Sequence, residues 1–72
     1  DERWAIEIKL TSAPTPADMA RLTKAAALAR ADRWLLVSQT PEPVVSARAA
    51  SCNLSWLLDR LAHRKAATSP GF

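Results

Sequence analysis

Apolar and polar residues alternate along residues 4–10, the segment Trp-Ala-Ile-Glu-Ile-Lys-Leu. In an extended chain, successive side chains point to opposite faces, so this alternation is typical of a strand with one packed face. The packed face is expected to hold Trp4, Ile6, Ile8 and Leu10. Ala5, Glu7 and Lys9 fall on the other face. We therefore predict a strand over residues 4–10 with one buried and one charged side.

A helix is predicted over residues 16–31, after a loop that contains two prolines. Thr15 fits the N-cap, Pro16 the first helical position, and Asp18 the position where a carboxylate favours the helix dipole. The stripe expected to face a sheet consists of Met19, Leu22, Ala25, Ala26 and Ala29. The basic residues lie mainly on other sides, where we expect a solvated surface, with phosphate contact as the alternative.

Residues 34–38, Trp-Leu-Leu-Val-Ser, form an apolar run that is typical of a strand buried on both faces. A strand, a helix and a strand with short connections predict a βαβ unit whose two strands are parallel neighbours. The next segment is ambiguous: residues 44–45 fit an edge strand and residues 49–52 a short strand. A turn at 46–48 would join them as an antiparallel hairpin beside the 34–38 strand.

A last helix is predicted over residues 54–65, with Asn53 as its N-cap. Its expected buried stripe consists of Leu54, Leu57, Leu58 and Leu61. The fold class is thus α/β, in the order β-α-β-(β)-α. We expect one small domain over residues 1–65 and a disordered tail over 66–72. The charged start inside a turn leads us to expect that an upstream strand belongs to the same domain, and that the chain is the C-terminal part of a larger protein.

The composition is that of a globular piece with a modest formal net charge of +3 and a single cysteine. No apolar run approaches the roughly 18 residues needed to cross a bilayer, and the start is no signal peptide, so we expect a soluble, cytoplasmic protein. Cys52 has no second cysteine to pair with, and we interpret it as a structural thiol. The scattered arginines and lysines permit nucleic-acid contact without requiring it.

Glu7 and Lys9 carry the candidate chemistry, because they project side by side near the end of a strand. A carboxylate there can hold a divalent ion, and a lysine can stabilise developing phosphate charge. Such a site needs a further carboxylate, but none of the five acids considered has an evident reason to reach Glu7: Asp1, Glu2, Asp18, Asp32 and Glu42. An exposed charge pair is the alternative interpretation.

The remaining candidates favour structural roles. His63 has no second ligand at metal-binding spacing and is interpreted as a helix-end cation. The three tryptophans, Trp4, Trp34 and Trp56, are expected to pack between elements instead of stacking bases. The chain contains no glycine-rich phosphate loop.

Three segments carry a resemblance to a known family that spans Glu2 to about Leu61. They are Trp-Ala-Ile-Glu-Ile-Lys with Ser-Ala-Pro, Asp-Arg-Trp-Leu-Leu-Val-Ser-Gln-Thr and Cys-Asn-Leu-Ser-Trp-Leu-Leu-Asp-Arg-Leu. They resemble the C-terminal region of a family of prokaryotic AAA-type ATP-binding proteins of unknown function, a restriction-endonuclease-like domain of the PD-(D/E)xK type. The resemblance implies that Glu7 is the second metal-binding carboxylate and Lys9 the catalytic lysine. We expect no cofactor in this fragment, and Mg²⁺ only where the parent protein completes the site. It assigns the first carboxylate to an upstream strand.

From this resemblance we expect a fragment of a restriction-endonuclease-like domain that acts as a recognition or assembly module of an AAA-type ATPase. Because the first carboxylate is missing, we expect no activity from this chain alone. The alternatives are half of a divalent-metal-dependent nuclease and a weak electrostatic nucleic-acid-binding module. The expected partners are an upstream ATPase domain of the same protein and, through an open sheet edge, a second copy of the chain.

Overall fold

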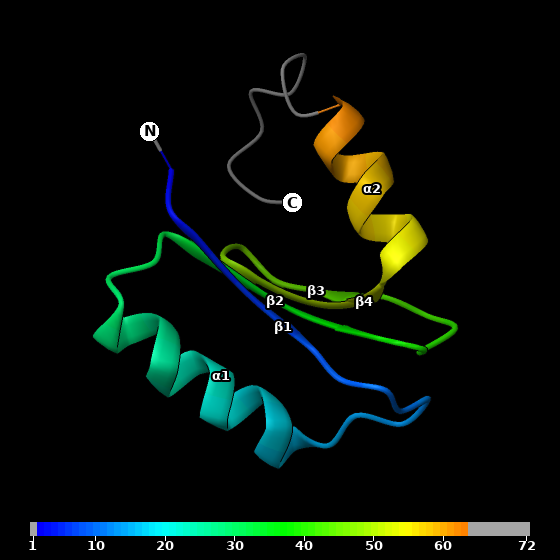
Figure 1. Cartoon of the computed structure of the whole chain (residues 1–72), viewed down its shortest axis with the longest axis horizontal. Coiled ribbons are helices and arrows are strands. Elements are labelled where there is room, and N and C mark those ends of the chain that lie inside the picture. Colours follow the sequence, from blue (N-terminus) through cyan, green and yellow to red (C-terminus); the bar gives the residue numbers. More distant parts are fainter. Residues whose placement is uncertain (1, 64–72) are drawn as a thin grey trace.

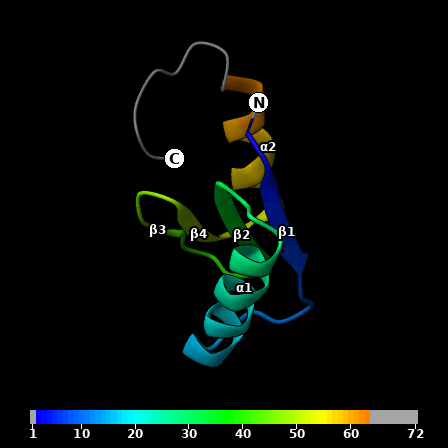
Figure 2. The same cartoon turned by 90° about the vertical axis from the view of Figure 1, so that its left-hand side faces the viewer.

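The computed structural model describes residues 2–63, which form a small mixed α/β domain with one four-stranded sheet and two helices. Helices α1 and α2 lie on opposite sides of the sheet (Figures 1 and 2), so the domain has three layers. The elements in chain order are β1 (Trp4–Ile8), α1 (Pro16–Leu28), β2 (Arg33–Ser38), β3 (Val44–Val45), β4 (Ala49–Asn53) and α2 (Leu54–His63).

The sheet has the strand order β1-β2-β4-β3. Strands β1 and β2 are parallel, with Ile6 opposite Leu35, which confirms the predicted βαβ unit. Strand β4 is also parallel to β2, and β3 is antiparallel to β4. The predicted hairpin is therefore present, and the carboxyl ends of β1, β2 and β4 meet at one edge of the sheet.

Helix α1 begins and ends through local hydrogen bonds. At its start, the Thr15 side chain accepts from the Asp18 N–H, and the Asp18 side chain accepts from the Thr15 N–H, which forms a capping box. At its end, Arg30 N–H donates to Ala27 C=O and Ala31 N–H to Ala26 C=O, the two bonds of a Schellman motif. These bonds place Arg30 at a positive φ of 56°. The helix therefore stops at Leu28, three residues earlier than predicted.

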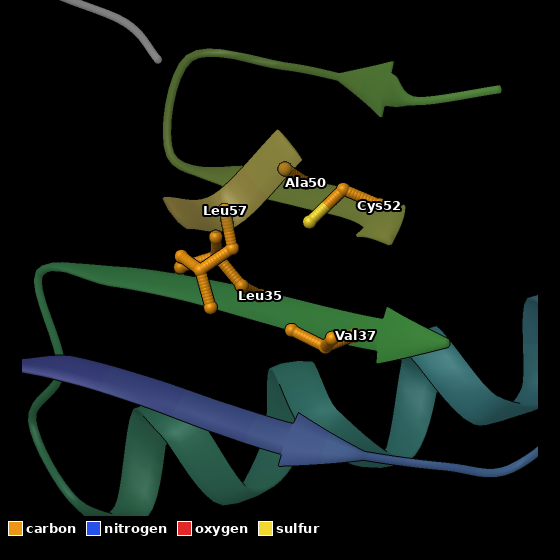
Figure 3. Close-up of a cluster of buried hydrophobic side chains, with 5 residues drawn as sticks. All are labelled: Leu35, Val37, Ala50, Cys52 and Leu57. Carbon is orange, nitrogen blue, oxygen red and sulfur yellow. The ribbon is translucent and has the colours of Figure 1, made fainter. Parts of the chain in front are cut away.

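The core lies between the central strands and α2. Figure 3 shows the side chains of β2, β4 and α2 converging there: Leu35, Val37, Ala50, Cys52 and Leu57. Trp4 and Trp56 pack against this cluster, which confirms their predicted packing role. On the other face, Trp34 donates its indole N–H to the Thr23 hydroxyl of α1 (3.0 Å). Strand β2 is thus covered on both faces, as its apolar run predicted.

The prediction that Ile6, Ile8 and Leu10 form a packed face of β1 is wrong. Ile6, Ile8 and Leu10 are 46%, 71% and 86% exposed, and the strand ends at Ile8. The physical reason is that α2 lies over β2 and β4, so only Trp4 of this face reaches the core.

The predicted helical stripes are only partly buried. In α1, Leu22 and Ala26 are buried and Met19 is half-buried, whereas Ala25 and Ala29 are exposed. In α2, Leu57 is buried, but the other three leucines are about half exposed: Leu54, Leu58 and Leu61. The predicted end of the last helix and the tail at 66–72 lie outside the described residues.

Candidate functional site

Glu7 and Lys9 lie on the face of β1 that is turned toward α1. Alternation along the strand separates them from Trp4, which packs on the α2 side. The Lys9 ammonium bonds the Asp18 carboxylate at the start of α1 (Nζ–Oδ1 2.5 Å). Glu7 is half-buried and forms no ion pair with any residue of the described range 2–63.

Asp18 is the centre of this site. It is only 2% exposed, and it accepts from the Thr15 N–H (2.8 Å), the Lys9 ammonium and the Arg21 guanidinium (2.5 Å). The Lys9 ammonium, followed by the Thr15 backbone, holds the pKa of Asp18 well below its usual range. Asp18 is therefore an ionised group that ties the end of β1 to the start of α1.

The sequence predicted a favourable interaction of Asp18 with the helix dipole and did not predict its contact with Lys9. A signal for it exists in the chain. A strand that enters a helix through a short loop brings the first helical turn back to the carboxyl end of that strand. A lysine just past the strand and an acid in that turn are then neighbours.

The other candidate carboxylates do not gather around Glu7. Glu2 accepts from the Arg33 guanidinium (2.9 Å), and Asp32 accepts from the Arg3 N–H (2.8 Å), both at the amino ends of β1 and β2. Glu42 lies exposed in the loop before β3, and Asp1 is outside the described range. Among residues 2–63, no three acidic, histidine or cysteine side chains are placed to hold a metal ion. The residues described therefore do not make a complete Mg²⁺ site.

A hollow of about 270 Å³ opens where β1 and β2 end, and it is largely apolar. Its lining residues are Ile8, Lys9, Leu10, Val37, Ser38, Gln39 and Leu54. Carboxyl ends of parallel strands are where α/β sheets place ligand clefts. This hollow offers one cation and mostly aliphatic surface, a lining suited to another apolar side chain.

The remaining chemical groups have structural partners. Cys52 is fully buried, and burial raises the pKa of its thiol, which fits its interpretation as a structural residue. The His63 ring lies 2.8 Å from the Asp59 carbonyl in the last turn of α2. Asn53 caps α2 as predicted, because its side chain accepts from the Trp56 N–H (2.9 Å).

Comparison of the chain with known protein families, with curated proteins and with solved structures found no match. Within the part of the chain that the structure describes, neither helix has the length and apolar character needed to cross a membrane.

Proposed function

We propose that this chain is a recognition and assembly module that binds a further strand along β1, in a protein that also carries an AAA-type ATPase domain. The observation that carries the proposal is the outer edge of β1. The surface that we call the β1 edge surface consists of Ile6 and Ile8 of β1 and Leu10 just past its end. These residues expose large aliphatic side chains at one end of the sheet. A strand edge of this kind readily pairs with another strand.

The backbone of β1 is suited to such pairing. Lys9 N–H donates to Val37 C=O (2.8 Å), and Arg3 C=O accepts from Asp32 N–H (2.7 Å). In a parallel ladder, alternate residues turn their backbone groups toward the same neighbour. The odd-numbered residues therefore face β2, and the N–H and C=O groups of Ile6 and Ile8 face outward.

The opposite edge of the sheet differs in a way that favours β1. Strand β3 has only two residues, and Pro41 and Pro43 precede it. Short edge strands and prolines limit pairing with further strands. Strand β1 has five residues and no proline, so it is the edge at which the sheet can be extended.

The ATPase and the restriction-endonuclease-like fold enter the proposal through the sequence resemblance. The parallel β1-α1-β2 unit, with Glu7 and Lys9 near the end of β1, is in keeping with it. In this proposal the ATPase domain belongs to the same polypeptide, and the β1 edge joins the module to its binding partner.

Amide hydrogen exchange tests the proposal. In the assembled ATPase-bearing protein, we expect the outward N–H groups of Ile6 and Ile8 to exchange slowly, because a bound strand would accept from them. Ile8→Lys should restore fast exchange at Ile6, whereas Leu28→Lys, which alters an exposed leucine on α1, should not. Fast exchange at both amides in the assembled protein would refute the proposal.

A second candidate is half of a divalent-metal-dependent nuclease site. It is favoured by the shared face of Glu7 and Lys9 at the carboxyl end of β1, and it requires carboxylates from another segment. The test is a Mn²⁺ titration of a longer protein that carries the upstream strands. Saturable binding that Glu7→Ala abolishes would support the half-site, and absence of binding would exclude it.

A further inference from the structure

We propose that the strand bound along β1 is β1 of a second copy of this chain, antiparallel to the first and related to it by a two-fold axis at Ile8. This inference rests on the proposed function, because it names the occupant of the same edge. The pairing would join two four-stranded sheets into one continuous sheet of eight strands, with an isologous interface.

The backbone restricts the registers that are allowed. The outward groups belong to even-numbered residues, so an antiparallel copy must place even residues opposite even residues. With the axis at Ile8, the Ile8 residues of the two copies exchange both hydrogen bonds. Ile6 of each copy then lies opposite Leu10 of the other, two residues past the end of β1, where the Thr11 N–H donates to the Lys9 C=O across Leu10 (2.9 Å).

Charge complementarity selects this register among the allowed ones. On the α1 side, Glu7 of each copy lies opposite Lys9 of the other, which gives two opposite-charge pairs. A shift of one allowed step in one direction places Glu7 against Glu7, and in the other direction Lys9 against Lys9. Like charges directly opposite each other destabilise a sheet.

The Glu7 carboxylate and the Lys9 ammonium are both able to form these pairs across the two copies. Glu7 has no ion-pair partner among the residues that the structure describes. The Lys9 side chain is 42% exposed, and its ammonium has three N–H donors, of which the contact with Asp18 uses one.

The apolar side chains support the same arrangement. On the α2 side, the β1 edge surfaces of the two copies would lie next to each other, with the two Ile8 side chains at the centre. Ile8 and Leu10 line the 270 Å³ hollow together with Leu54, so an aliphatic side chain from the second copy has apolar neighbours there. The exposed side chains of β1 thereby gain contacts that α2 does not provide.

Cysteine cross-linking tests both the partner and the register. In the proposed dimer, the Cα atoms of the two Ile8 residues are about 5.5 Å apart, within the range for a disulfide. Ile8→Cys should therefore form a covalent dimer on mild oxidation. Ile6→Cys is the matched control, because the two position-6 residues would be roughly 13 Å apart along the strands. Buried Cys52 should remain reduced in both variants.

Sedimentation equilibrium tests the charge pairs. Glu7→Lys should raise the dimer dissociation constant about tenfold or more, since two attractive pairs become repulsive. Glu42→Lys, the matched control, changes the net charge equally at an exposed loop position and should leave the constant unchanged. Circular dichroism of each variant checks that the fold is retained.

The outcomes separate this inference from the proposed function. A chain that stays monomeric at millimolar concentration, or that cross-links through position 6 and not position 8, overturns the second-copy inference. If Ile8 is nevertheless protected in the ATPase-bearing protein at any dilution, another strand occupies the edge and the proposed function stands. Concentration-dependent dimers with the Ile8→Cys cross-link establish the inference.

Discussion

The two helices differ in how they are held to the sheet. Helix α1 buries Leu22 and Ala26 against β1 and β2, and Asp18 joins its first turn to Lys9. Helix α2 buries one residue, Leu57, and leaves its other leucines about half exposed. A periodic apolar stripe therefore predicts a helix, but the sheet beneath it decides how much of the stripe is buried.

The difference also distinguishes two kinds of surface. Ala26, the buried alanine of α1, lets the helix backbone approach β1 and β2, and the ionic contacts of Asp18 hold the helix start to the end of β1. On the α2 side, the helix covers β2 and β4, and the face of β1 next to it is exposed. The unequal cover is the structural origin of the β1 edge surface, on which the proposed assembly depends.

The largest effect is expected for Leu57→Ala. Leu57 is the one fully buried residue of α2 among residues 54–63, so after its loss only the half-buried Trp56 still packs the helix against the core. We expect the free energy of unfolding to fall by about 3 to 4 kcal/mol, which would largely unfold a domain of this size. Urea denaturation followed by circular dichroism measures it. Leu58→Ala, at 55% exposure, is the control and should cost less than about 1 kcal/mol.

A smaller loss is expected for Leu22→Ala in α1. Leu22 is 3% exposed, but Ala26 and the Asp18 contacts also hold the helix, so the helix should stay docked. We expect a decrease of about 2 to 3 kcal/mol in the free energy of unfolding. A loss larger than that of Leu57→Ala in the same urea series would show that α1, not α2, depends on a single anchor.

The helices and strands of this fold could be predicted from the sequence because local residue patterns determine them. Thr15, Pro16 and Asn53 fix the starts of both helices, and the apolar run of β2 indicates a central strand. The exposure of Ile8 could not be predicted, since it depends on where α2 lies over the sheet. The alternation in β1 indicated a strand correctly but not which strand would lie at the edge.

For the candidate site, the sequence likewise predicted the local geometry but not the contacts between elements. The spacing of Glu7 and Lys9 placed them on one face, and the structure agrees. The neighbour of Lys9 was not foreseen, because Asp18 comes from the next element and its position depends on the path of the intervening loop. The role of Glu7 stays a prediction, to be tested by the pairing with a second copy and by metal titration.

The ion pair at the start of α1 predicts a stability change in acid. Its low folded-state pKa means that Asp18 stabilises the fold fully above about pH 4, the ordinary pKa of an aspartate, and that this contribution is lost as the pH falls toward the folded value. Asp18→Asn should lower stability at pH 7 and flatten the decline of stability below pH 4. Urea unfolding between pH 7 and pH 2 measures the free energy of unfolding of both proteins at each pH.

The matched control for this prediction is Thr15→Ala. It removes the hydroxyl that accepts from the Asp18 N–H but leaves the carboxylate and its bond to Lys9. We expect a loss of about 1 kcal/mol that depends less on pH than the loss in Asp18→Asn, because the Thr15 side chain lowers the pKa of Asp18 less than Lys9 does. If Asp18→Asn and Thr15→Ala gave the same pH dependence, the Lys9 contact would have no part in the stability of α1.

The smallest effect concerns the other end of α1, where Arg30 holds a φ of 56° without being glycine. A side chain costs free energy in this left-handed region, so Arg30→Gly should stabilise the domain by about 0.5 kcal/mol, after allowing for the greater freedom of glycine in the unfolded chain. Ala29→Gly, one residue earlier at a φ of −85°, is the matched control and should instead destabilise it by a similar amount. If Arg30→Gly raises the free energy of unfolding and Ala29→Gly lowers it, the Schellman motif persists in solution. The end of α1 is then set by its backbone conformation and not by its apolar stripe. Destabilisation by both glycines would mean that residue 30 does not hold the left-handed conformation, and α1 would then extend toward the 31 predicted from its sequence.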